Sequence, residues 1–150
     1  MYRHILIPTD GSELAEHGVR HGLALAKSLG AKVSVIMVQE PFDWLSVPET
    51  GASQWQELDK LSKYNEHIEK YAASILSRAA DAAKEAGVPS DTIQVANAQP
   101  YQAIVAAASE RGCDLIVMSS HGRSGLSAVL LGSVTNKVLT HTKSPVLVCH

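Results

Sequence analysis

The chain alternates short apolar runs with longer stretches in which apolar residues recur every three or four positions. Short runs rich in Val, Ile and Leu are typical of buried strands, and the longer spacing is typical of amphipathic helices. The pattern predicts five strands, at residues 4–8, 32–38, 92–98, 113–118 and 145–149. It also predicts four helices, at residues 13–29, 54–86, 100–111 and 133–141.

Two of the predicted helices carry further information. Ser12 is a plausible N-cap of the first helix, and Gly30 ends it. Gly18 and Gly22 lower the helix propensity, so we interpret them as points of close approach to the sheet. The second helix would be about 50 Å long at 1.5 Å per residue, whereas a typical strand covers ~17–20 Å. Either this helix breaks near Asn65 or its first turns extend beyond the sheet.

Apolar strands separated by helices imply an α/β fold with a mostly parallel sheet covered on both faces. We expect one Rossmann-like domain over residues 1–150 with an open five-stranded sheet in the order 3-2-1-4-5. Such folds bind ligands beyond the carboxyl ends of the strands at the switch point, here between strands one and four. These strands end in Pro8-Thr9-Asp10 and in the polar residues 119–122, so both polar ends are expected to share one crevice.

The segment after the fourth strand resembles a phosphate-binding loop in its physical design. An apolar run is followed by Gly122, then by Gly132-Ser133, and Val134 begins a new helical pattern. Glycine lets a backbone approach a ligand closely, and the free N–H groups of a helix N-terminus attract anions. We therefore expect a nucleotide or another phosphorylated small molecule.

The composition narrows the functional classes. A hydrophobic content of 45%, a charged content of 19% and a net charge of −2 are typical of a globular domain and leave no nucleic-acid footprint or basic membrane patch. No stretch reaches the roughly 18 apolar residues of a membrane span. Cys113 and Cys149 fit reduced, buried thiols, so we expect a cytoplasmic protein.

Charged and histidine side chains near the crevice each have a functional and a purely structural interpretation. A carboxylate repels a triphosphate, so Asp10 is expected at the nucleoside end, although a turn aspartate that bonds its own backbone is the simpler alternative. His121 and Arg123 either face phosphate or form a solvated surface pair, and Arg123 is the better electrostatic partner. His17 and His21 have a metal-like i, i+4 spacing but lack a third ligand, so we expect exposed histidines and no metal site.

These residues resemble the universal stress protein family over the whole chain: ILIPTDGS at the start, VIMV with an acidic residue after it, and SHGRSGLSAVLLGSVTNKVLTHTKSPVLV at the end. The nucleotide-binding branch carries G-x2-G-x9-G-[S/T], and Ser119, Gly122, Gly132 and Ser133 occupy those positions, with Ser119 in place of glycine. Ser119 is unfavourable if its backbone needs a positive φ, and its hydroxyl is alternatively a donor to phosphate. The resemblance implies ATP in the crevice, adenine read by the backbone of Val38, a homodimer through the last strand and a role in stress survival.

Three functions remain open at this point. The first is an ATP-binding regulatory module, in which Mg²⁺ would accompany the triphosphate. The second is a nucleotide-free homodimer that acts through protein contacts. The third is an enzyme of a related α/β fold, but the SGGxDS, HxGH and P-loop motifs are absent, which leaves at most slow ATP hydrolysis. The candidate nucleotide-binding residues are Pro8, Thr9, Asp10, Val38, Ser119, His121, Gly122, Arg123, Gly132, Ser133 and Val134.

Overall fold

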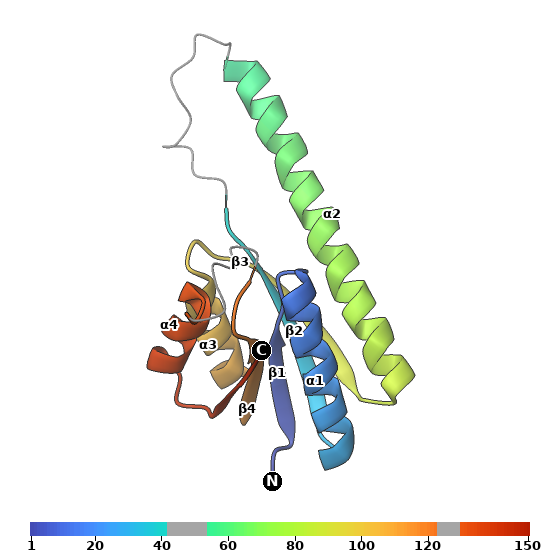
Figure 1. The fold of residues 1–150 in the computed structure, drawn as a ribbon. Coiled ribbons are helices and arrows are strands. Elements are labelled where there is room, and N and C mark those ends of the chain that lie inside the picture. Colours follow the sequence, from blue (N-terminus) through green and yellow to red (C-terminus); the bar gives the residue numbers. More distant parts are fainter. Residues whose placement is uncertain (42–53, 123–129) are drawn as a thin grey trace.

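In a computed structural model, the chain forms alternating strands and helices around one sheet (Figure 1). The structure describes residues 1–41, 54–122 and 130–150. Arg123 and the segment between residues 42 and 53 therefore lie outside the described residues. The elements are β1 (His4–Pro8), α1 (Glu13–Leu29), β2 (Lys32–Gln39), α2 (Gln54–Ala86), β3 (Ser90–Ala96), α3 (Pro100–Glu110), β4 (Leu115–Ser119), α4 (Ser133–His141) and β5 (Val146–Cys149).

The sheet has the order β3-β2-β1-β4-β5, which confirms the predicted order 3-2-1-4-5. Every neighbouring pair is parallel. β1 lies in the middle, with Ile5 opposite Val33 of β2 and opposite Leu115 of β4. The carboxyl ends of β1 and β4 are therefore neighbours at the switch point, as the topology requires.

Several strand boundaries differ from the prediction, and hydrogen bonds outside the local pattern account for those of β3 and for the start of β4. Strand β3 begins at Ser90 rather than residue 92, since Pro89 already accepts a bond from the Val33 amide. It ends at Ala96, after which Asn97 forms a side-chain turn with the Gln99 amide. Strand β4 begins at residue 115 rather than 113, because the Cys113 amide bonds back to α3. Strand β2 extends one residue further than expected, to residue 39.

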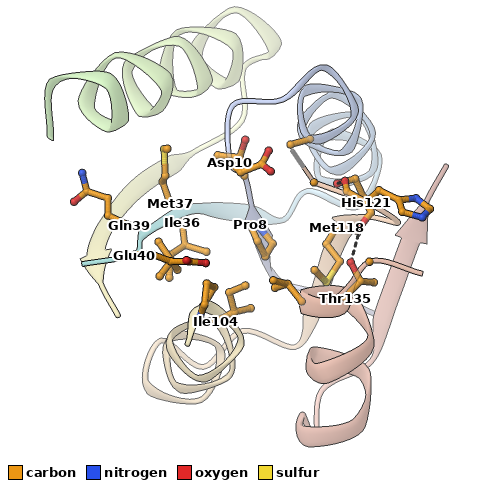
Figure 2. A pocket seen from close by; sticks show the side chains of 18 of the residues that line it. Pro8, Asp10, Ile36, Met37, Gln39, Glu40, Ile104, Met118, His121 and Thr135 are labelled. Atoms are coloured by element: carbon orange, nitrogen blue, oxygen red, sulfur yellow. Dashed lines mark hydrogen bonds between the residues drawn. The ribbon is translucent and has the colours of Figure 1, made fainter. Parts of the chain in front are cut away.

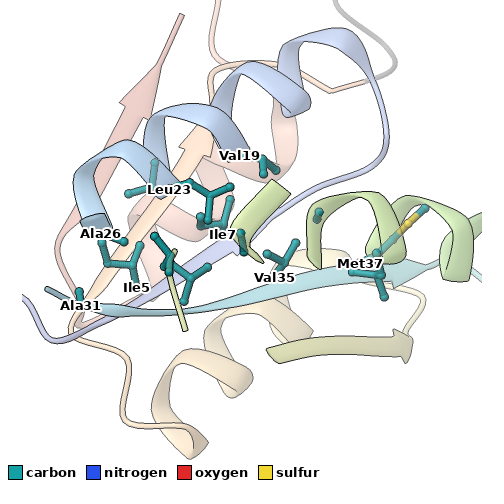
Figure 3. Packing of buried hydrophobic residues seen from close by; sticks show 14 of the residues in the cluster. Ile5, Ile7, Val19, Leu23, Ala26, Ala31, Val35 and Met37 are labelled. Carbon is teal, nitrogen blue, oxygen red and sulfur yellow. The ribbon is translucent and has the colours of Figure 1, made fainter. Parts of the chain in front are cut away.

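Alternate residues of the central strands supply two apolar cores, one on each face of the sheet. Ile5, Ile7, Val33 and Val35 pack with α1 and α2 on one face (Figure 3). Leu6 belongs to the other core, which α3 and α4 cover. Burial on both faces explains the nearly continuous apolar runs of these strands.

Gly18 and Gly22 are points of close approach between α1 and the sheet, as predicted. A Cβ atom on Gly22 would lie 2.3 Å from Cδ1 of Ile7, and one on Gly18 would lie 3.3 Å from the amide nitrogen of Ser119. Ser12 caps this helix by accepting from the Ala15 amide, and Gly30 ends it at φ 64°. The two glycines lower the stability of the helix, but because they have no Cβ atom they let α1 lie close to the sheet.

Helix α2 is continuous from Gln54 to Ala86, so its first turns extend beyond the sheet rather than breaking near Asn65 (Figure 1). Only the second half of the helix is anchored in the core. The buried α2 residues among those described begin at Ala72 and are Ala72, Ile75, Leu76, Ala79 and Ala83.

A buried polar chain crosses the amino end of the sheet. The His4 side chain is 7% exposed; its Nδ1 donates to the Arg111 carbonyl at 3.1 Å, and its Nε2 lies 2.8 Å from the Ser34 hydroxyl. Ser34 also hydrogen-bonds the Asp91 carboxylate, which pairs with the Arg111 guanidinium at 2.7 Å. Burial, assisted by the positive charge of Lys32, lowers the pKa of His4 below 6.5.

Both cysteines are free and buried, as the sequence predicted. Burial raises the pKa of the Cys113 thiol to about 11 and also raises the pKa of Cys149. Such thiols are unreactive at neutral pH.

Candidate functional site: a glycine-walled pocket

A pocket of about 480 Å³ opens at the carboxyl ends of the strands (Figure 2). Its floor is formed by the ends of β1, β2 and β4, and its sides by α2, α3 and the start of α4. Every candidate residue within the described part of the chain lines it: Pro8, Thr9, Asp10, Val38, Ser119, His121, Gly122, Gly132, Ser133 and Val134. Residues separated by more than a hundred positions in the sequence thus share one cavity.

The turn between β1 and α1 presents Asp10 to this pocket. One carboxylate oxygen, Oδ1, accepts from the Ser12 amide at 2.9 Å, which forms the turn considered as the simpler alternative. The Gly11 amide donates to the Thr9 hydroxyl at 3.2 Å, and Gly11 has a φ of 80°, a conformation that favours glycine. The turn therefore fixes one carboxylate oxygen and leaves the residue facing the cavity.

The end of β4 supplies the opposite wall. Ser119 ends β4 in extended strand conformation, so its backbone needs no positive φ, and the condition under which serine would be unfavourable there is not met. Its hydroxyl donates to the His121 carbonyl at 2.8 Å. Ser119 thus stabilises the loop that follows it. The sequence did not predict this role.

His121 is partly buried rather than a solvated surface residue. Its Nδ1 lies 3.0 Å from the Ser120 hydroxyl, and its Nε2 is buried without a hydrogen-bond partner among the described residues. Figure 2 shows the ring directed away from the centre of the pocket. A direct contact between this ring and a phosphate stays a prediction.

Space, and not the backbone angle, restricts the two glycines of the loop. A Cβ atom on Gly132 would lie 3.1 Å from the Ser120 carbonyl oxygen and 3.3 Å from Cα of His121. Gly132 itself has φ −57°, which any residue can adopt. At Gly122, a Cβ atom would lie only 2.4 Å from Oδ2 of Asp10. Both glycines thus make close contacts within the protein, and the close approach to a ligand that the sequence predicts stays a prediction.

Helix α4 begins directly at the pocket. Gly132 is its N-cap and makes no side-chain cap, so the first amides of the helix face the cavity without a capping group from that residue. Thr135 in the first turn donates its hydroxyl to the Ser119 carbonyl at 2.9 Å, which ties α4 to β4 (Figure 2). A helix N-terminus arranged in this way attracts anions.

Asp10 and Gly122 are in contact. The sequence placed Asp10 at the nucleoside end of the ligand and Gly122 at its phosphates, so a larger separation was expected. If Asp10 contacts the sugar, the phosphates must extend from Gly122 toward Gly132 and Ser133. Along the described residues, Asp10 and Glu40 line the pocket and no lysine or arginine does. Among the described residues, the charge of an anion would therefore be met by backbone amides.

Several lining residues were missed by the sequence interpretation. Thr135 follows the recognised Gly132-Ser133 pair by two positions and could have been included as part of the same helical turn. The residues from α2 and α3 had no such signal, because their spacing is that of ordinary amphipathic helices. They are Tyr64, Ile68, Tyr71, Pro100 and Ile104.

The described residues contain neither a candidate metal site nor a candidate membrane-spanning helix. His17 and His21 are exposed, and no group of three potential metal ligands occurs within the residues that the structure describes. Among the same residues, no helix combines the length and the apolar character needed to cross a membrane.

Comparison with known proteins agrees with the geometry. A sequence profile described as "Universal stress protein family" matches residues 1–150. Universal stress protein MJ0531 of Methanocaldococcus jannaschii is 32% identical over 148 residues, covering 99% of this chain and 82% of that protein. Universal stress protein YxiE of Bacillus subtilis is also 32% identical, covering 99% of both chains.

Solved structures give the same result. The structure of MJ0577 superposes with a TM-score of 0.77 at 30% identity, covering 99% of this chain and 95% of its own. A universal stress protein crystallised in complex with cAMP has a TM-score of 0.70 at 28% identity, covering 99% and 97%. The chain therefore belongs to the universal stress protein family.

Proposed function

We propose that this protein is an ATP-binding regulatory protein of the stress response, acting in the cytoplasm, with the nucleotide held between the carboxyl ends of β1 and β4. The observation that carries the proposal is the start of α4, where a helix N-terminus without a side-chain cap opens into a glycine-walled pocket. This arrangement offers backbone N–H groups to phosphate.

The size of the pocket supports a nucleotide. Small-molecule sites commonly have volumes of about 300–1,000 Å³, and this one has about 480 Å³. The related protein with bound cAMP shows that this fold can hold an adenine nucleotide. In the proposal, Gly122, Gly132 and Ser133 contact the phosphates, and Val38 reads the base through its backbone.

Asp10 is proposed to accept hydrogen bonds from the ribose. Its Oδ1 accepts from the Ser12 amide and its Oδ2 lies against Gly122, so the carboxylate is held at the wall of the pocket. Mg²⁺ would be carried by the triphosphate and would keep several waters, since Asp10 and Glu40 are the only carboxylates lining the described pocket. Regulation rather than turnover is proposed because the motifs of related α/β enzymes are absent from the sequence.

The test is direct titration of the protein with ATP, after acid extraction to remove and identify any nucleotide that co-purifies. Gly132→Val should lower the affinity at least tenfold, because the side chain meets backbone atoms of Ser120 and His121 that cannot move independently. Leu139→Val on the exposed side of α4 is the matched control and should bind normally. A folded Gly132→Val variant with wild-type affinity would refute the site, and a wild-type protein that binds no adenine nucleotide would refute the function.

A nucleotide-free homodimer is the second candidate, favoured by the edge strand β5. This strand pairs with β4 on one side, and Leu147 is 42% exposed. An apolar edge is a site for pairing with a second copy. The two functions differ in one measurement, since a dimer that acts only through protein contacts binds no nucleotide.

A further inference from the structure

Helix α2 forms a wall of the pocket that none of the recognised motifs includes. Tyr64, Ile68 and Tyr71 all line the cavity. Their spacing of four and three residues places them on one face of the helix. The wall therefore begins in the part of α2 that extends beyond the sheet and ends where the helix enters the core.

This wall faces a second apolar wall across the cavity. Pro100 and Ile104 of α3 line the pocket from the other face of the sheet. Figure 2 shows α2 on one side of the pocket and Ile104 on the other, with the ends of β1 and β2 between them. Apolar side chains from α2 and α3 thus line opposite sides of one part of the pocket, and a planar apolar ring is the kind of ligand group that such a lining accepts.

This part lies on the β2 side of the pocket, away from the glycines of the phosphate loop. Helix α2 packs against β2 and β3, whereas Gly122 and Gly132 follow β4 on the other side of β1. A mononucleotide that places its phosphates at the glycines therefore extends its base toward α2. The proposed base-reading residue, Val38, ends β2 on the same side.

We infer that α2 is part of the nucleotide-binding site, with Tyr64 and Tyr71 holding the base against α3. The inference rests on the proposed function and assigns its base-recognition surface. Tyrosine is suited to this role because its ring stacks on any base face at a small loss of conformational freedom. Contacts with α2 therefore favour a planar base, and their contribution to the affinity does not depend on the number of phosphates.

The experiment therefore compares ligands that share the base and differ in the number of phosphates. Adenosine, AMP and ATP are titrated into the wild-type protein and into Tyr64→Ala, whose side chain is 46% exposed, so that truncation leaves the core intact. Loss of one stacking ring should weaken all three ligands by the same factor, about 5- to 100-fold. Tyr64→Phe keeps the ring and should bind as the wild type does. Leu58→Ala, also exposed on α2 but not lining the pocket, is the matched control.

The outcomes separate this inference from the proposed function. Wild-type affinity in Tyr64→Ala for all three ligands, or a loss confined to ATP, overturns the role of α2 while the nucleotide site stands. Gly132→Val should show the opposite pattern, weakening AMP and ATP more than adenosine. A wild-type protein that binds none of the three ligands overturns the proposed function and the inference with it.

Discussion

The contact between Asp10 and Gly122 leads to a quantitative prediction for Gly122→Ala. The new methyl group would lie 2.4 Å from Oδ2 of Asp10, so the carboxylate must retreat by about 1 Å to reach ordinary contact. The bond from the Ser12 amide to Oδ1 is 2.9 Å long and would exceed hydrogen-bonding distance after such a shift. Bonds to charged acceptors contribute about 1.5–3 kcal/mol, and partial exposure of Asp10 reduces this, so we expect a loss of about 1–2 kcal/mol in unfolding free energy.

A double-mutant cycle isolates this contact. Urea denaturation would give the unfolding free energy of the wild type, Gly122→Ala, Asp10→Ala and the double variant. Without the carboxylate the methyl group has room, and it also reduces the freedom of the unfolded chain. Gly122→Ala should therefore be neutral or slightly stabilising in the Asp10→Ala background. Equal destabilisation in both backgrounds would show that the contact is not the cause.

Three further predictions concern other parts of the molecule. The stability should decrease as the pH falls below about 6.5, because burial lowers the pKa of His4 in the fold and the unfolded chain takes up the proton first. His4→Gln should lack this part of the pH slope in denaturation experiments, and an unchanged slope would contradict the assignment. Val148→Lys on β5 should convert a dimer into a monomer in ultracentrifugation, and a wild-type protein that is monomeric at micromolar concentration would exclude the dimer. Ser119→Gly should lose about 1 kcal/mol of stability with its bond to the His121 carbonyl and should not bind ATP more tightly; a several-fold gain in affinity would contradict the stabilising role.

The sequence predicted the strand order because two independent signals agreed. The alternation of strands and helices limited the topology, and the two polar strand ends were adjacent in only some of the allowed orders. The close approach of α1 to the sheet could be predicted from Gly18 and Gly22, because glycine weakens a helix interior and is favoured there mainly where a larger side chain does not fit. The starts of β3 and β4 were not predictable in the same way, since bonds such as that from the Cys113 amide to Ala108 form only after α3 has packed.

The sequence indicated the pocket residues whose type is restricted by local backbone contacts, and it missed those that only packing brings to the pocket. Gly122, Gly132 and Ser133 have a recognisable spacing, and a larger side chain at either glycine would meet neighbouring residues of the pocket wall. Tyr64 and Tyr71 have the spacing of any amphipathic helix, and only the path of α2 across the sheet brings them to the pocket. The sequence left the role of Ser119 open, because it does not show whether the backbone at this position is extended or needs a positive φ.

The division of α2 at Ala72 has a consequence for how the molecule opens. From Ala72 onward the helix shares the core of the domain, so its amides should exchange hydrogen with solvent only when the whole domain unfolds. The preceding turns extend beyond the sheet and have no buried residue among those whose burial is described. A helical segment of this length is marginal by itself in water, so these amides should exchange through local fraying. Protection should therefore rise sharply near Tyr71, and any molecule that engages the outer turns should move that boundary toward the N-terminus of the helix.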